Sequence, residues 1–301
     1  MAGGAGGRSA ALFAVRPQGY QPRMFTPSDL DVLVPTRDRP GALAVTLAGL
    51  AAQTAPGFRV VISDQSREPV AGDRLVAAQV RILGHRDRPV DVLRHLPARG
   101  MAEQRAFLLD RADRRLALYL DDDVWLEPEA IEVLLAAMNG LRCGFVGFAL
   151  HGLSYRDDVR PAELAPYEEW TGGVRPERVR RGSPAWRRWT LHNASNPLHL
   201  AQEHIGAPGP REWRPYKVAW IGGCVLYDRE RLLECGGFDF WRSVPPRHAG
   251  EDVAAQLRVM ERYGGAGLLP SRAYHLELPT TITDRGAECY DYVFEAAAGA
   301  R

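Results

Sequence analysis

The sequence predicts an α/β protein with a mixed, mostly parallel sheet flanked by helices. Short apolar runs alternate with segments of helical periodicity through the first half of the chain, and this alternation is typical of parallel sheets covered by helices. Three of the apolar runs end in polar clusters. The 301 residues are 46% hydrophobic and 25% charged, which suffices for a core and excludes a mostly disordered chain.

The first half of the chain carries the clearest strand and helix signals. Residues 31–35 form an apolar run that ends at a proline, and we expect a buried strand there. Leu43, Leu47 and Leu50 recur at helical spacing within residues 41–53. Further strands are expected at residues 58–62, 80–83 and 116–120, and further helices at residues 101–111 and 128–138.

Residues 151–216 interrupt the pattern with a stretch rich in Pro, Gly, Arg and Trp. Long irregular segments inside compact domains are usually functional loops or disordered insertions. Around this insertion we expect strands at residues 143–150, 218–227 and 266–269, a helix at residues 251–263 and an extended segment at residues 272–278. Gly222 and Gly223 break the second of these strands.

One domain is expected over residues 29–285. Residues 1–28 begin with a glycine- and alanine-rich stretch, and we expect a flexible arm there. The apolar run within this arm is too short for a secretory signal. Residues 286–301 are expected to form a C-terminal tail.

The composition also limits compartment and partners. The 38 basic and 37 acidic side chains leave a formal charge of +1, so a nucleic-acid partner is not expected. The longest uncharged stretch, residues 40–58, contains polar residues, a proline and three glycines, so no transmembrane segment is expected. The four cysteines form no C-x-x-C pair and suit the reduced thiols of a cytosolic protein. We therefore expect a cytoplasmic protein, with any membrane contact peripheral.

Polar clusters follow three of the expected strands: residues 36–38, Asp64, and residues 121–123. In a parallel sheet the carboxyl ends of the strands share one edge, where ligands bind, so these clusters should converge. Asp121, Asp122 and Asp123 repel one another, and an oxygen-rich site of this kind suits Mg²⁺ or Mn²⁺. A solvated turn before a helix is the alternative.

Two further sets of residues are weaker candidates for a functional role when each is taken alone. Glu251 and Asp252 start a predicted helix, where a carboxylate can simply be a helix cap. His275 follows a short strand and, taken alone, is expected to be structural.

Seven motifs in order resemble the family-two glycosyltransferases, which have the GT-A fold. The resemblance runs from about Asp31 to His275, apart from the insertion. Ser63 replaces the first Asp of a V-D-D-G-S pattern, and Ala106 replaces the Asn of a G-x-x-x-A-R-N pattern. The motifs lie at residues 32–38, 62–66, 100–105, 121–123 (D-x-D), 220–224 (G-G), 236–239 (G-G-F-D) and 250–253 (G-E-D-V).

The resemblance implies a metal-dependent, inverting transfer of a sugar from a nucleotide diphosphate sugar, with UDP favoured. Residues 29–125 would form the nucleotide-sugar half. Asp123, with Asp121 and His275, would hold Mn²⁺ or Mg²⁺. By the same resemblance, the donor would be contacted by Pro35, Thr36 and Arg37 around the base, Asp64 on the base, Asp122 at the ribose or sugar, and Arg105 near the nucleotide or its aspartates.

The resemblance places the acceptor in residues 126–285, with the insertion on that side. Asp252 would be the general base, and Glu251, Gly222, Gly223 and Trp241 would belong to the acceptor site. Tryptophans 170, 186, 189 and 241 either stack on a sugar or aromatic ring or pack the insertion onto the core. Six arginines between residues 175 and 188 either bind an anionic group of the acceptor or form a solvated face.

Other functions compete with this one. Residues 118–124 also fit the h-h-h-D-x-D-x-V pattern of phosphatases and phosphotransferases with an aspartyl nucleophile, but that pattern usually opens its domain and leaves Asp64 and Arg105 unexplained. A nucleotidyltransferase would usually have a basic, Gly-rich first loop, and residues 37–40 (Arg-Asp-Arg-Pro) match that loop poorly. A catalytically inactive nucleotide-binding module is the non-enzymatic alternative. The sugar, the acceptor (a small molecule, a glycan or a lipid-linked carrier) and a homo-oligomeric state stay open.

Overall fold

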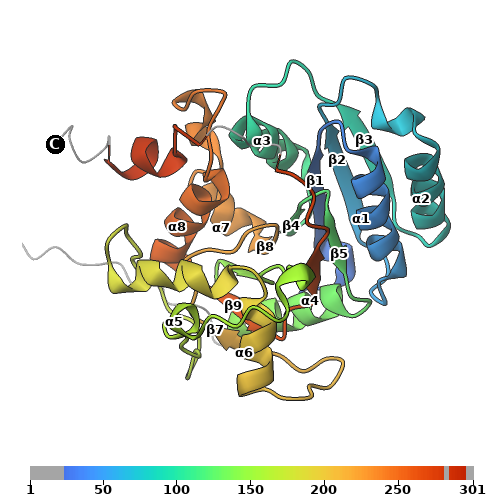
Figure 1. Cartoon of the computed structure of the whole chain (residues 1–301). Coiled ribbons are helices and arrows are strands. Elements are labelled where there is room, and N and C mark those ends of the chain that lie inside the picture. The colour runs from blue at the N-terminus through green and yellow to red at the C-terminus, as the bar shows by residue number, and fades with distance from the viewer. Residues whose placement is uncertain (1–23, 281–284, 296–301) are drawn as a thin grey trace, which may run out of the picture.

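In the computed structural model, residues 24–280 and 285–295 are described (Figure 1). An eight-stranded sheet in the order β3-β2-β1-β4-β8-β6-β9-β7 forms the centre of the molecule, and β10 pairs with β5 in a small second sheet. The strands are β1 (Leu30–Thr36), β2 (Arg59–Asp64), β3 (Val90–Arg94), β4 (Leu116–Leu120), β5 (Val124–Leu126), β6 (Phe145–Gly147), β7 (Arg214–Tyr216), β8 (Cys224–Asp228), β9 (Gly265–Leu269) and β10 (Ala273–His275).

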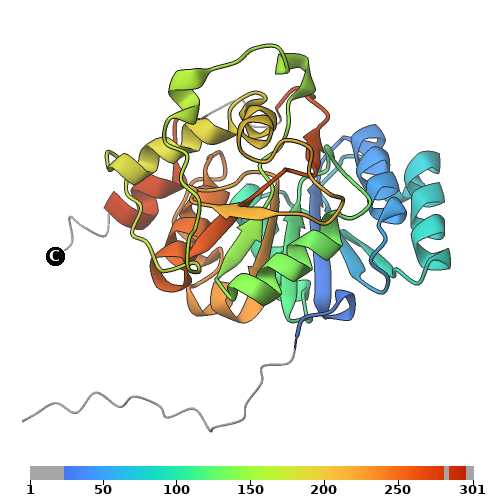
Figure 2. The same ribbon diagram turned by 90° about the horizontal axis from the view of Figure 1, so that it is seen from below.

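Helices cover both faces of the large sheet (Figures 1 and 2). The α-helices are α1 (Pro40–Ala52), α2 (Arg74–His85), α3 (Met101–Arg111), α4 (Ala130–Leu141), α5 (Pro161–Leu164), α6 (Asn196–His204), α7 (Arg229–Glu234) and α8 (Glu251–Tyr263). Shorter turns are η1 (Pro27–Asp29), η2 (Val70–Gly72), η3 (Leu153–Tyr155), η4 (Pro184–His192), η5 (Asp239–Arg242) and η6 (Asp291–Glu295).

The alternation of side chains along β1 shows why the sheet needs helices on both faces. Leu30, Val32 and Val34 pack into one apolar cluster with the leucines of α1, whereas Leu33 belongs to a second cluster that includes α3. Successive residues of a strand point to opposite faces, so a strand buried throughout requires two apolar layers. All seven residues of β1 are buried.

The topology marks one position in the sheet as a ligand site. From β1 the chain passes to β2 and β3 on one side, then returns to β4 on the other side of β1, and all these pairs are parallel. The crevice beyond the carboxyl ends of two strands at such a reversal is where open α/β sheets bind ligands. The predicted α/β class, with a mostly parallel sheet flanked by helices, is confirmed.

One expected strand is wrong. Residues 80–83 lie inside α2, whose start is capped by Asp73: its side chain accepts hydrogen bonds from the backbone N–H groups of Leu75 and Val76. A four-residue apolar run fits one side of a helix as well as a strand, and the cap decided between them. The third strand is instead β3, an edge strand whose residues are partly exposed.

The insertion is ordered around short elements. Residues 151–216 contain η3, α5, η4, α6 and β7, and β7 extends the sheet by pairing with β9. Tyr216 is fully buried there. The segment expected to begin the tail also packs on the domain, because the N–H of Cys289 donates to the carbonyl of Ala249 at 2.9 Å and Tyr290 is buried.

Parts of the expected N-terminal arm and C-terminal tail lie outside the described residues. Residues 1–23 of the expected arm and residues 296–301 of the expected tail lie outside the described part. Phe25, within the described part, exchanges two hydrogen bonds through its backbone with the side chain of Asn139. Between residues 24 and 280 and in residues 285–295, none of the helices has the length and apolarity needed to cross a membrane. The four cysteines carry free thiols.

Candidate active site

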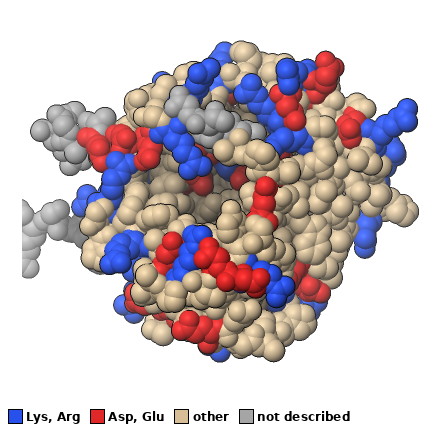
Figure 3. Space-filling view, viewed as in Figure 1, with Lys and Arg blue, Asp and Glu red and all other residues tan. Residues whose placement is uncertain are grey.

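A pocket of about 850 Å³ opens at the carboxyl ends of β1 and β4. In Figure 3 it is the hollow near the centre of this face, with acidic and basic side chains around it. Of the residues predicted from the sequence, the pocket brings together Pro35, Thr36, Arg37, Arg105, Asp121, Asp122, Asp123, Gly222, Gly223, Glu251, Asp252 and His275.

The direction of the strands explains this convergence. β1 and β4 are parallel and end at the pocket, whereas β8 is antiparallel to β4 and begins there. The N–H of Asp121 donates to the carbonyl of Gly223 at 3.0 Å, which links the segment after β4 to the segment before β8. α8 starts at the same edge after Gly250, so its first turn presents Glu251 and Asp252 to the pocket.

Asp122 is held from two sides. It accepts hydrogen bonds from Thr36 Oγ1 at 2.7 Å and from Arg39 Nη1 at 2.8 Å. Thr46 Oγ1 donates to its backbone carbonyl at 2.9 Å. Burial disfavours the ionised carboxylate and raises the pKa of Asp122 to about 6, even though the two side-chain contacts act in the opposite direction.

Asp123 has a different electrostatic environment. Arg39 Nη2 donates to its Oδ2 at 2.9 Å, and His275 Nε2 lies 3.4 Å from the same oxygen. Burial raises the pKa of Asp123, but the His275 hydrogen bond and the Arg39 charge outweigh it and lower that pKa below its usual value. The same contact raises the pKa of His275. The carboxylate is therefore anionic at neutral pH and faces a guanidinium and an imidazole.

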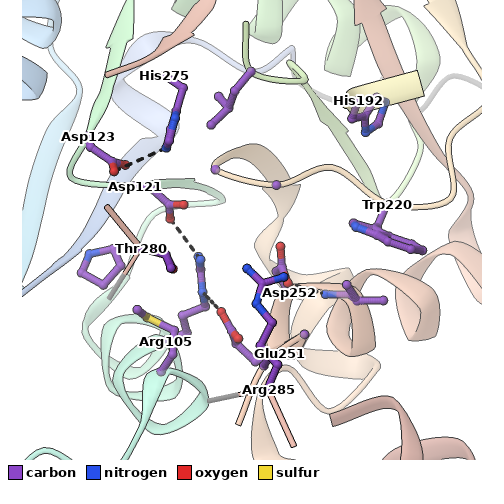
Figure 4. Close-up of a pocket in the computed structure, with 18 of the residues that line it drawn as sticks. Arg105, Asp121, Asp123, His192, Trp220, Glu251, Asp252, His275, Thr280 and Arg285 are labelled. Carbon is purple, nitrogen blue, oxygen red and sulfur yellow. Dashed lines mark hydrogen bonds and ion pairs between the residues drawn. The ribbon is translucent and has the colours of Figure 1, made fainter. Parts of the chain in front are cut away.

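The side chain of Arg105 connects α8 to residues 121–123, which we call the aspartate loop (Figure 4). Its Nη2 lies 3.1 Å from Asp121 Oδ1 and its Nε lies 2.9 Å from Glu251 Oε1. Its side chain is only 7% exposed, so this pair of contacts compensates charges that are largely out of water. The Tyr119 hydroxyl donates to the backbone carbonyl of Arg105 at 2.7 Å, which holds the backbone at this position.

Asp252 is a carboxylate of the pocket whose pKa is raised toward neutral pH. Burial and the neighbouring charge of Glu251 raise its pKa to about 7, against the lowering effect of Arg105. Its side chain lines the pocket and is partly exposed to it. The N–H of Val253 donates to Asp252 Oδ1 at 2.8 Å and fixes the orientation of the group.

Two predicted site residues are not brought to the pocket. Asp64 is fully buried; it accepts hydrogen bonds from the N–H groups of Ser66 and Val70 and pairs with Arg94 at 2.9 Å. These contacts direct its carboxylate at its own loop. Trp241 does not line the pocket and stacks under the guanidinium of Arg242.

The arginine run of the insertion mostly has acidic partners. Arg180 pairs with Glu261, Arg181 with Glu288, and Arg188 with Glu177. The charges of these three arginines are compensated, which favours the structural interpretation for them, although Arg181 also lines the pocket.

Several pocket residues were not foreseen from the sequence. The rings of His192 and Trp220 lie across the pocket from Asp123 (Figure 4). Trp186 and Trp189, two of the tryptophans weighed for stacking, also line the pocket, whereas Trp170 does not. The polar and aromatic lining residues that the sequence did not point to are Arg39, Gln104, His192, Asn193, Trp220, Thr280, Arg285, Glu288 and Tyr290, and Arg181 of the arginine run lines the pocket as well. Their positions depend on pairing between distant segments, for which no local pattern exists.

A side chain at position 223 would be strained by the backbone conformation and would overlap its neighbours at the edge of the pocket. The φ of Gly223 is +76°, and an added Cβ would lie 2.5 Å from Leu150 Cδ1 and 3.4 Å from Asp121 Oδ2. We expect Gly223→Ala to lower the free energy of unfolding by about 1–3 kcal/mol because of left-handed strain and overpacking. Urea unfolding measures this effect. Gly172→Ala is the control: its φ is +79° with nothing within 4 Å of the added Cβ, so it isolates the strain. Equal losses in both variants would contradict the overpacking part of the prediction.

The donor set of the pocket fits a divalent cation that a substrate helps to bind. Within the described residues, no group of three or more His, Cys, Asp or Glu side chains could hold a metal ion on its own. Asp123 and His275 nevertheless present an anionic oxygen and an imidazole nitrogen to the same point, with Asp121 beside them. Mg²⁺ is usually held by one or two carboxylates together with substrate phosphates, so this incomplete set is appropriate.

A parallel sheet that reverses beside an aspartate-rich pocket is the architecture of GT-A glycosyltransferases. The sequence profile described as glycosyl transferase family 2 matches residues 31–197, more than half of the chain, and the protein belongs to that family. A search of curated proteins found no match.

Solved structures agree with the fold. Residues 1–349 of TarS from S. aureus superpose with a TM-score of 0.52 at 16% identity, over 82% of this chain and 60% of that one. The same fragment in complex with UDP-GlcNAc gives a TM-score of 0.50 at 14% identity, over 84% and 60%. This chain thus spans less than two thirds of the length of those structures. At these identities the likeness shows the fold.

Proposed function

We propose that the protein transfers a sugar from a UDP-sugar to an acceptor hydroxyl, with a divalent cation and with inversion at the anomeric carbon. The observation that supports this most directly is the placement of a carboxylate with a raised pKa, Asp252, in the same pocket as the aspartate loop 121–123. One side of the pocket then suits a diphosphate and the other suits a group that loses a proton.

The donor half of the proposal depends on the end of β1. Pro35, Thr36 and Arg37 line the pocket, and the Arg37 guanidinium is planar and able to stack on a base. Asp122, which Thr36 and Arg39 hold in place, faces the donor's ribose or sugar. UDP is the preferred nucleotide, in keeping with the UDP-GlcNAc complex of the TarS fragment.

Asp123 and His275, with Asp121, would hold Mn²⁺ or Mg²⁺. When bound, such an ion neutralises the charge that develops on the departing diphosphate. Arg105 keeps Asp121 and Glu251 in place for the donor and acceptor sides respectively.

In the chemical step Asp252 takes the proton of the acceptor hydroxyl as that oxygen forms a bond to the anomeric carbon. The bond from this carbon to the diphosphate oxygen breaks, and its electron pair leaves with the nucleoside diphosphate. Attack from the side opposite the leaving group inverts the configuration in a single displacement. The raised pKa of Asp252 suits proton transfer near neutral pH.

The aromatic side of the pocket is assigned to the acceptor. Trp186 contacts both Trp220 and Tyr290, with ring centroids 4.9 Å and 5.2 Å apart, and Trp189 is 41% exposed beside them. Flat apolar rings of this kind suit the face of a sugar or of an aromatic group. The acceptor is a small molecule, a glycan or a lipid-linked carrier.

Thermal unfolding with nucleotides tests the donor assignment. We expect UDP with Mn²⁺ to raise the melting temperature by about 5 °C at a concentration of about 100 Kd, because only the folded state binds it. dTDP, GDP, ADP and CMP should give smaller shifts. The shift should be smaller without Mn²⁺ and should be lost in Asp123→Ala.

Asp157→Ala is the matched control, since that side chain is 94% exposed and remote from the pocket. A response to phosphate or a phosphate mimic, with none to any nucleotide, would favour a phosphotransferase. If UDP binds but no UDP-sugar is consumed with any acceptor, a nucleotide-binding module without activity is the better description.

A further inference from the structure

The side chain of Arg39 contacts two residues of the aspartate loop, Asp122 and Asp123, although no sequence motif singled it out. It immediately precedes α1, and its side chain is 17% exposed. Its two terminal nitrogens are divided between neighbouring carboxylates: Nη1 donates to Asp122 at 2.8 Å and Nη2 donates to Asp123 at 2.9 Å. A guanidinium placed this way cancels the mutual repulsion of two buried anions.

The same nitrogen has a third contact. Arg39 Nη2 also donates to the carbonyl oxygen of Pro279 at 3.0 Å, in the segment that follows β10. Its bond to Asp123 is made at Oδ2, the oxygen that His275 Nε2 approaches to 3.4 Å. A divalent cation held by Asp123 and His275 therefore needs the position that Nη2 faces, and two cations repel each other strongly there.

We propose that Arg39 is a positioning residue that holds Asp122 and Asp123 in place without metal, and that a divalent cation binds by displacing Nη2 from Asp123. Nη1 keeps its bond to Asp122 throughout, so the side chain stays in the pocket. Nη2 is then left with the carbonyl of Pro279 and with any phosphate oxygen of the donor. This inference rests on the metal assigned to Asp123 in the proposed function.

Titration of the full chain with Mn²⁺ alone, followed by the electron paramagnetic resonance signal of the free ion, tests the displacement. We expect Arg39→Met to bind Mn²⁺ about tenfold more tightly than the wild type, because a charge-assisted hydrogen bond no longer competes for Asp123. Arg39→Lys should lie between the two, since one ammonium group replaces a fork that spans both carboxylates.

Arg67→Met is the matched control. Its side chain is 89% exposed, pairs with Asp38 and does not line the pocket, so the variant measures the long-range effect of charge alone. Its Mn²⁺ affinity should stay within about twofold of the wild type, because exposed charges are screened.

A second measurement separates this role from a merely structural one. In EDTA, Arg39→Met should melt at a lower temperature than the wild type, because two carboxylates lose their counter-ion. Saturating Mn²⁺ should recover more of the melting temperature in this variant than in the wild type.

If Arg39→Met binds Mn²⁺ no more tightly than the wild type, the displacement is refuted. If Arg39→Met does not fold, the affinity of Arg39→Lys decides the matter in the same way. A lack of Mn²⁺ binding in every variant, both without UDP and with saturating UDP, also refutes it. The assignment of glycosyl transfer is tested separately by consumption of the UDP-sugar in the wild type, with and without EDTA.

Discussion

Asp252→Asn is expected to lower kcat by about 10³-fold at pH 8, because an amide of the same shape cannot take the acceptor proton. UDP binding should stay within about twofold of the wild type, since the proposed function assigns Asp252 to the acceptor side and the donor contacts to other residues. Initial rates with the UDP-sugar and acceptor, together with calorimetric titration of UDP, measure the two effects separately.

The pH profile gives an independent check on the same residue. The base must be ionised to accept a proton, so kcat/KM should rise as pH increases through about 7, with a slope of one, and level off above it. Asp91→Asn is the control: its side chain is 51% exposed on β3, and it should leave the rate and profile unchanged. Loss of UDP binding in Asp252→Asn, or retention of its activity, would refute the role of Asp252 as base.

Arg105→Met is expected to lower the free energy of unfolding by about 3–5 kcal/mol, because breaking a buried ion pair on one side leaves uncompensated charge. The charges left behind are those of Asp121 and Glu251, both within 3.1 Å of the guanidinium. Methionine keeps most of the apolar stem, so the packing against Tyr119 is largely preserved. Urea unfolding followed by circular dichroism measures the loss.

The same substitution should change the chemistry in a predictable direction. The Arg105 charge lowers the pKa of Asp252, so its removal should shift the rising limb of the pH profile to higher pH. Arg111→Met on the same helix is the control, because that side chain is exposed and rests on the ring of Phe107. A loss below about 1 kcal/mol would mean that water screens the pair, as at a protein surface. An unshifted profile would mean that Arg105 does not act on Asp252.

Several elements follow from local sequence alone, and for these the prediction was accurate. The helix at residues 101–111, the strand at residues 116–120 and the helix at residues 251–263 have the expected bounds. In each of these segments the apolar spacing and the flanking residues favour the same element, so local preference and tertiary packing agree. The convergence of residues 36–37 with residues 121–123 was also predicted correctly, because it depends on strand direction, which the alternation of strands and helices determines. For Asp64 the same prediction was wrong, since its side chain does not line the pocket.

Where local signals were weak, packing decided. Residues 80–83 have no periodicity long enough to separate a helix from a strand, and β3 carries partly exposed edge residues that resemble a loop. The identity of Asp64 at the end of β2 was predicted to matter, yet the direction of its carboxylate depends on Ser66, Val70 and Arg94. A motif specifies a residue type at a position, and neighbours specify where its side chain points.

The sequence by itself determined the fold class, the family resemblance and the carboxylates of the pocket, because strand and helix periodicity and ordered motifs are local properties of the chain. Only the tertiary structure decided which charges meet. Arg39 reaches an aspartate 84 residues away, and Arg105 reaches Glu251 across 146 residues. An ion pair has no periodicity, and its energy depends on burial and distance, which exist only once the chain has folded.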